Sequence, residues 1–327
     1  MNPTPGDVHV NTPLSNISVA YLQQASDFIA GDVFPNVPVP KQSDRYYIYD
    51  RGDFNRDEMK ERAPGTESAG GGYNLDNTPT YFCRVRAYHK DVTDEVRANS
   101  DPALNPDNDA AEYISAKGLI KKERIFADTY MVGGVWTNDF DGVAATPGAN
   151  ETLQWNDPTS TPIEDIRAAK TAVKLSGGFM PNTLVLGQQV LDSLMDHPDL
   201  VDRVKYGTQS GVSVVDLSEL RALFKIERIL IMGAIRNTAV EGAAETNAFI
   251  GGKKAFLCYS APRPGLMVPT AGYTFSWNGL LGASAFGTRV RKFRMDPINS
   301  DRVEIDMSFD MKVVSADLGF FWDTIVA

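Results

Sequence analysis

The chain has 327 residues, of which 43% are hydrophobic and 23% are charged, and this ordinary globular composition excludes disordered and fibrous proteins. Acidic residues outnumber basic ones by 42 to 32, and the resulting net charge argues against tight nucleic-acid binding by the surface as a whole. The two cysteines, Cys83 and Cys258, are too few for a disulfide framework or a zinc site. We expect a soluble protein made in a reducing compartment, without a signal peptide or a membrane span.

Residues 1–44 predict an arm. They combine six prolines with scattered single hydrophobic residues such as Leu22, Phe28 and Phe34. Such a segment cannot bury enough apolar surface by itself to offset the entropy that it loses on ordering. We therefore expect it to pack against something else; a mobile tail is the alternative.

The next segment, residues 45–90, predicts a projecting tongue. Strand-forming residues at 45–49 and 81–88 flank a long polar excursion that contains three consecutive glycines at 70–72. The excursion has too few apolar residues to form a core, and loops of this length are usually functional or disordered. We interpret the tongue as a two-stranded device for contacts.

The strongest helix signal covers residues 109–132. Asp109 and Glu112 have the spacing of a capping box, and Gly133 and Gly134 end the helix. Apolar residues recur at the helical period and define the buried stripe that we expect: Tyr113, Ala116, Leu119, Ile120, Phe126, Ala127, Tyr130 and Met131.

Residues 161–260 predict a compact α/β unit. Thr161, Pro162 and Glu164 form a helix start, and strand and helix patterns alternate after it. The chain then ends in strands, since apolar and polar residues alternate without a break from 303 to 313. We expect the preceding strand, 287–295, to pair with this one so that Met295 lies opposite Val303. That register places Arg294 opposite Glu304 and Lys292 opposite Asp306.

The sequence offers no catalytic machinery. A phosphate-binding loop is missing, because the stretch around Lys253 lacks the first glycine and the Ser/Thr. Three histidines, His9, His89 and His197, supply neither a zinc cluster nor a Ser-His-Asp arrangement, and we interpret each as structural. The Arg-Gly-Asp tripeptide at 51–53 is better explained by a turn at a strand end than by adhesion. We expect no catalytic, cofactor-binding or metal-binding residues.

The order of these elements resembles that of tailed-bacteriophage major capsid proteins, the Hong Kong 97-like fold, over essentially the whole chain. Local strings carry the resemblance together with that order: RAPGTE at 62–67, YFC at 81–83, VTDEVRAN at 92–99, the strand at 183–186 and HPDL at 197–200. The long helix that ends near Tyr130 lies between the third and fourth strings.

The resemblance implies an α+β fold and a division of the chain. Residues 1–44 would be the N-terminal arm and 45–90 the extended loop. Residues 91–160 and 261–327 would form the peripheral domain, with residues 109–132 as its spine helix and C-terminal β strands. Residues 161–260 would be the axial domain.

The resemblance also implies a function. The chain would self-assemble into hexamers and pentamers of an icosahedral virion shell around double-stranded DNA, without sequence-specific DNA binding, after synthesis in the host cytoplasm. A separate scaffold protein, a portal and decoration proteins would be partners; no cofactor or membrane is implied. Eight residues are expected at inter-subunit contacts: Arg56, Lys60, Arg62, Tyr73, Asp94, Arg97, Arg294 and Glu304.

Three alternatives remain open at this stage. An encapsulin-type nanocompartment shell shares the fold and differs in what it encloses. An enzyme built on residues 161–260 is disfavoured by the scarcity of histidine and the missing phosphate loop. A tail or baseplate component would form rings or tubes in place of closed shells.

Overall fold

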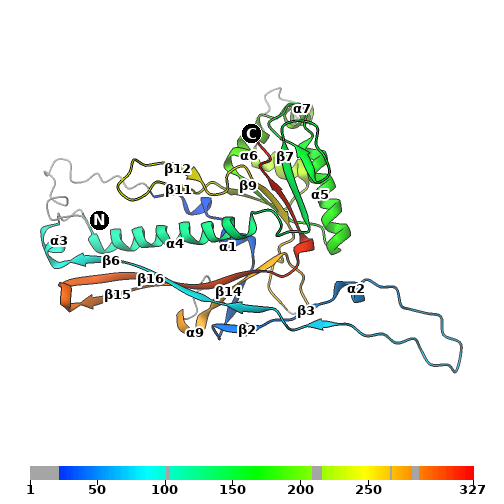
Figure 1. Ribbon diagram of the computed structural model, residues 1–327, viewed down its shortest axis with the longest axis horizontal. Coiled ribbons are helices and arrows are strands. Elements are labelled where there is room, and N and C mark those ends of the chain that lie inside the picture. The colour runs from blue at the N-terminus through cyan, green and yellow to red at the C-terminus, as the bar shows by residue number, and fades with distance from the viewer. Residues whose placement is uncertain (1–21, 101–103, 208–215, 266, 282–286) are drawn as a thin grey trace.

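The computed structural model describes residues 22–100, 104–207, 216–265, 267–281 and 287–327. Two sheets, one long helix and a projecting tongue dominate the fold (Figure 1). Helices and strands occur together throughout, so the expected mixed α and β fold class is confirmed. Within the ranges just given, no helix is both long and apolar enough to cross a membrane.

The first sheet is built around one long strand, β16. In order, the sheet contains β1 (Asn36–Val39), β14 (Gly272–Trp277), β16 (Ser300–Val313) and β15 (Thr288–Met295), and β6 (Arg84–Thr93) pairs with β16 as well. All neighbours of β16 run antiparallel to it, whereas β1 runs parallel to β14. Short helices flank these strands: α3 (Asp94–Asn99), α9 (Asn278–Leu281) and the 3-10 turn η2 (Asp296–Ile298).

Helix α4 (Pro106–Tyr130) lies along the first sheet (Figure 1). It begins earlier than expected, because Asn105 accepts a hydrogen bond from the amide of Asn108 at 3.3 Å and Pro106 occupies the first turn; the predicted cap at Asp109 is wrong.

The buried stripe of α4 also differs from the prediction in its first half. Tyr113 and Leu119 are 40% and 39% exposed, whereas Ile114 and Gly118 are buried. A Cβ atom on Gly118 would lie 3.0 Å from Cδ1 of Ile305, so at this position the side chains of the sheet reach the helix where it has no side chain. Hydrophobicity alone cannot indicate such a contact.

The second sheet carries the remaining long helices. Its order is β10 (Arg228–Met232), β9 (Thr183–Gly187), β13 (Ala255–Cys258), β17 (Gly319–Asp323), β7 (Asn138–Val143) and β8 (Glu151–Leu153). The helices of this region are α5 (Pro162–Gly177), α6 (Gln188–Met195), α7 (Pro198–Gly207) and α8 (Leu217–Phe224). The expected α/β unit, 161–260, therefore shares its sheet with β7, β8 and β17, which the sequence analysis assigned to the peripheral domain.

The pairing of β15 with β16 differs from the predicted register by three residues. Met295 lies opposite Ser300, Arg294 opposite Asp301 and Lys292 opposite Val303, so the pairs predicted for these three residues are wrong. The cause is the connection: η2 closes the turn in three residues, and Asn299 adopts a left-handed conformation with φ of 42°. Because the shift is an odd number, it also exchanges the two faces of β15 relative to β16.

The described part of the arm packs on its own chain. It contains η1 (Ala25–Asp27), α1 (Ala30–Val33) and β1. Phe34 is fully buried and its ring lies 5.4 Å from the rings of both Phe126 and Tyr130 on α4. The expected packing thus takes place within one subunit, while residues 1–21 lie outside the described residues.

Two further parts leave the body of the molecule. The tongue contains β2 (Ser43–Arg45) paired with β5 (Thr80–Phe82), β3 (Ile48–Tyr49) paired with β4 (Leu75–Asp76), and α2 (Arg51–Phe54). A hairpin of β11 (Ile235–Asn237) and β12 (Asn247–Phe249) extends above α4 in Figure 1. The 3-10 turn η3 (Ala316–Leu318) precedes β17.

Candidate inter-subunit surfaces

The tongue extends far from both sheets and ends in a long stretch without strands or helices (Figure 1). Its two antiparallel ladders pair Arg45 with Thr80 and Ile48 with Asp76. The β2–β5 ladder is held against the first sheet, because Tyr81 is buried and its ring stacks on that of Phe275 at 4.6 Å. The β3–β4 ladder has only two residue pairs, and an isolated two-stranded ribbon is at best marginally stable in water. The outer part of the tongue therefore needs another surface to become rigid.

Three aromatic rings form a cluster on the tongue. The ring centres of Tyr49, Phe54 and Tyr73 lie 5.7 to 6.0 Å apart. Tyr73 is nevertheless 62% exposed and Phe54 is 51% exposed. Such rings gain free energy when a partner covers them, at roughly 25 cal/mol per Å² of apolar area. The aromatic cluster is thus suited to an interface.

The basic residues of the tongue differ in how they are paired. Arg56 forms ion pairs with Asp53 at 3.7 Å and Glu58 at 3.2 Å. Lys60 and Arg62 are exposed, and neither forms an ion pair or a side-chain hydrogen bond with the described residues. Lys60 and Arg62 can therefore bind a partner without first breaking an ion pair within the described chain.

Arg51 and Asp53 anchor the tongue. Arg51 forms an ion pair with Asp317 at 2.6 Å and donates a hydrogen bond to the backbone carbonyl of Ser176. Asp53 accepts a hydrogen bond from the backbone amide of Asn74 at 2.8 Å. Both ends of the Arg-Gly-Asp tripeptide are thus used inside the chain, which agrees with a structural interpretation of that sequence.

Asp94, Arg97 and Arg294 meet in one charge cluster with Asp107, Lys292 and Asp301. Arg97 contacts Asp107 and Asp301, each at 2.9 Å, and Arg294 contacts Asp94 at 2.6 Å. Lys292 closes the cluster through Asp107 at 2.7 Å. The hydrogen bond from Arg294 holds the pKa of the Asp94 carboxyl below its usual range. The cluster joins α3, α4 and the β15–β16 turn within one subunit.

Glu304 lies away from that cluster. Its carboxylate contacts Arg291 at 2.5 Å, and Arg291 also contacts Asp306 at 3.2 Å. The predicted partner, Arg294, is on the opposite face of β15, as the register requires. Of the eight residues expected at contacts, Asp94, Arg97, Arg294 and Glu304 are thus paired internally, as is Arg56 on the tongue.

A buried carboxylate fixes the arm to the long helix. Glu123 on α4 is 1% exposed, and its two oxygens accept hydrogen bonds from the amides of Ile29 at 3.1 Å and Ala30 at 2.8 Å. Burial raises the pKa of Glu123 to about 7, although both amides act in the opposite direction. Glu123 was not among the residues predicted from the sequence; its signal is a charged residue in phase with the buried positions 126 and 130.

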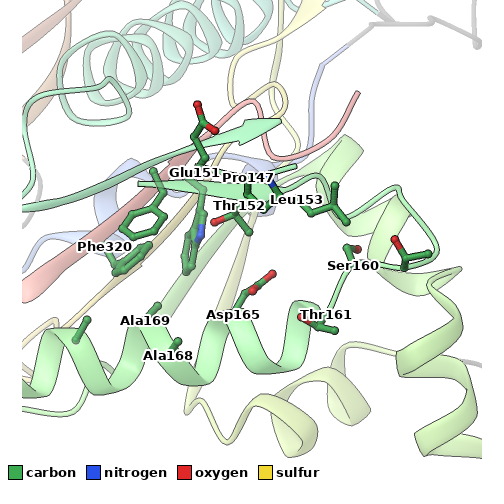
Figure 2. A pocket seen from close by; sticks show the side chains of 14 residues that line it. Pro147, Glu151, Thr152, Leu153, Ser160, Thr161, Asp165, Ala168, Ala169 and Phe320 are labelled. Carbon is green, nitrogen blue, oxygen red and sulfur yellow. The ribbon is translucent and has the colours of Figure 1, made fainter. Parts of the chain in front are cut away.

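One cavity, of about 340 Å³, lies between α5 and the strands β7, β8 and β17 (Figure 2). Fourteen residues line it, including Asp165, Glu151 and Ser160, and none is a histidine, cysteine, lysine or arginine. Among the described residues, no group of three or more His, Cys, Asp or Glu side chains could hold a metal ion. The cavity therefore offers no recognisable set of catalytic groups.

The pair of side chains that most resembles a catalytic pair, His197 and Ser160, has a structural role. His197 is buried, and its Nε2 lies 3.0 Å from Oγ of Ser160 and 3.1 Å from the carbonyl of Asp157. Its Nδ1 accepts a hydrogen bond from the amide of Asp199 at 3.2 Å, at the start of α7. A catalytic histidine would instead face a carboxylate on that side. His197 caps α7, as a structural histidine would.

The chain is similar to major capsid proteins of phages. A family model described as phage major capsid protein E matches residues 119–268. The chain is 28% identical over 330 residues to the major capsid protein of Pseudomonas phage JBD67, covering 97% of each chain. The prediction of a tailed-phage major capsid protein is confirmed.

Solved structures agree on the fold of this capsid protein. The capsid of cyanophage P-SCSP1u matches with a TM-score of 0.59 at 10% identity, covering 98% of this chain and 94% of that one. The encapsulin of Synechococcus elongatus PCC 7942 matches with a TM-score of 0.55 at 10% identity, covering 96% and 95%. At such low identity these matches establish a shared fold and nothing about the contents of a shell.

Proposed function

We propose that the chain assembles into an icosahedral shell of pentamers and hexamers that encloses double-stranded DNA in the virion. The observation that supports this most is the similarity, along almost the full length, to a phage major capsid protein. Net negative charge fits DNA that is confined by the shell and not held by sequence-specific contacts. A separate scaffold protein, a portal and decoration proteins belong to the same proposal, as does synthesis in the host cytoplasm.

In this proposal residues 1–44 are the arm, 45–90 the extended loop, 91–160 and 261–327 the peripheral domain, and 161–260 the axial domain. The tongue supplies the main contact through Lys60, Arg62 and Tyr73, with Arg56 beside them. Its exposed rings and unpaired basic side chains have no function in an isolated subunit. The charge cluster that contains Asp94, Arg97 and Arg294, together with Glu304, shapes the sheet that receives a neighbour. The subunit has no enzymatic activity.

A nanocompartment shell is the second candidate, because an encapsulin shares the fold. The relatives with significant sequence similarity are phage proteins, and this favours the phage shell. The two differ in contents: a phage shell forms around a scaffold and receives DNA, whereas a nanocompartment encloses enzymes. Genes for a portal and a terminase next to this one would support the phage shell.

Electron microscopy of the purified protein, alone and with its scaffold, tests the proposal. We expect closed angular particles from the wild type. The triple variant Lys60→Ala, Arg62→Ala, Tyr73→Ala should remain folded by circular dichroism and fail to form particles, whereas Lys121→Ala, on the exposed face of α4, should assemble normally. Rings or monomers from the wild type under both conditions, or normal shells from the triple variant, would contradict the proposal.

A further inference from the structure

The cavity beside α5 has a continuous aromatic wall. Phe140 and Phe320 have ring centres 4.8 Å apart, and Phe320 and Trp322 are 4.4 Å apart. Trp322 in turn lies 5.5 Å from Trp155, which is fully buried and does not itself line the cavity. The opposite side is formed by small residues of α5, among them Ala168 and Ala169, which keep the space open (Figure 2).

A carboxylate projects into the same space. Asp165 points from α5 into the cavity below Thr152 (Figure 2). One of its oxygens accepts a hydrogen bond from the indole of Trp155 at 3.0 Å, and within the described residues no other donor contacts this carboxylate. Burial raises the pKa of Asp165 above its usual value. The negative charge of the ionised Asp165 carboxylate is thus only partly balanced by its surroundings.

The charges around the cavity have one sign. Among the described residues that line it, the titratable ones are Asp165 and Glu151, and Glu151 already accepts a hydrogen bond from the amide of Gly148 at 2.6 Å. An anion would be repelled by both groups. A calcium or magnesium ion, which takes six or more oxygen ligands, would find only one free carboxylate oxygen on Asp165. An organic cation satisfies both features, since it pairs with the carboxylate and lies against aromatic faces.

We propose that this cavity binds a small organic cation, an ammonium compound whose apolar body lies on the wall of Phe140, Phe320 and Trp322 and whose charge faces Asp165. The volume is at the lower end of the range for small-molecule pockets, roughly 300–1,000 Å³. The inference is independent of shell formation.

Calorimetric titration of the full-length, unassembled protein with 1,4-diaminobutane tests this proposal, and 1,4-butanediol serves as the neutral probe of the same length. We expect the diamine to bind and the diol not to bind. Asp165→Asn should weaken diamine binding by about tenfold or more, because the charged partner is lost. Asparagine can still accept the hydrogen bond from Trp155, so the fold should be retained. Phe320→Leu should weaken binding by about threefold through loss of the ring face.

Glu112→Gln is the control, because it removes a carboxylate at an exposed position of α4 that does not line the cavity and leaves Asp165 in place; its diamine affinity should stay close to that of the wild type. Equal binding of diamine and diol, full affinity in Asp165→Asn, or no diamine binding at millimolar concentration would each overturn the proposal. The titration is repeated on assembled particles. Loss of diamine binding on assembly would indicate that a basic side chain of a neighbouring copy fills the cavity. That result would also overturn the proposal that the cavity binds a free ligand.

Discussion

Replacing Glu123 tests how the arm is fixed to the long helix. Alanine at this position would leave the amides of Ile29 and Ala30 buried without an acceptor. An unsatisfied buried donor costs about 1–3 kcal/mol, so the two together predict a loss of about 2–6 kcal/mol in the free energy of unfolding. This is a large part of the roughly 5–15 kcal/mol that stabilises a typical domain. The amides of Ile29 and Ala30 should also exchange with solvent faster.

Glu123 should also make stability depend on pH. Its pKa rises from 4.5 to about 7 on folding, so the folded state holds the proton more tightly than the unfolded state. The resulting stabilisation is complete below about pH 4.5 and is lost as the pH rises through about 7. At about 1.4 kcal/mol per pKa unit, the loss across this window is about 3 kcal/mol. Glu123→Gln has no titrating group at this position and should lack this component.

Urea denaturation of unassembled protein from pH 5 to pH 8 measures both effects. Wild type, Glu123→Ala and Glu123→Gln are compared, with Glu112→Ala as a control at an exposed position of the same helix. Lys122 and Asp32 are coupled to this carboxyl by charge, so the difference between wild type and Glu123→Gln reports the carboxyl together with its effect on these two neighbours. The reasoning is refuted if Glu123→Ala is as stable as Glu112→Ala, or if the pH curves of wild type and Glu123→Gln are parallel.

Two further predictions concern packing and thiol chemistry. Gly118→Val should lower the free energy of unfolding by about 1–3 kcal/mol, because even its Cβ would lie 3.0 Å from Ile305 and 3.3 Å from Met307; an unchanged urea midpoint would contradict this contact. Burial raises the pKa of both Cys83 and Cys258 to about 12, so iodoacetamide at pH 8 should label them only after unfolding. Labelling of native protein at the rate of a free thiol would show that the two sites are accessible.

Periodicity predicted the existence of the long elements better than their buried faces, because the stripe predicted for α4 is wrong in its first half. The strand that contains Val303 to Met311 is the clearest success, since every second residue in this range is buried. The register of its partner could not be predicted in the same way. It depends on the conformation of Asn299, which allows a turn three residues shorter than the alternating pattern suggested.

The candidate surfaces could be predicted only in part from the sequence. Composition indicated that the tongue cannot form a core, and Lys60, Arg62 and Tyr73 are indeed exposed there. Pairing depends on long-range contacts, however, and two residues expected at interfaces, Asp94 and Arg294, contact each other across 200 positions of the chain. A charged residue in a sequence gives no sign of whether its partner is in the same subunit.

The long strand β16 gives the subunit a mechanical axis. Its fourteen residues pair with β6 along Ser300–Phe309, and with β15 and then β14 along the other side. A force along β16 loads these antiparallel ladders in shear, so many hydrogen bonds must fail together, whereas a force across the sheet would separate one pair at a time. The subunit should therefore resist stretching most along the direction shared by β16 and α4 in Figure 1.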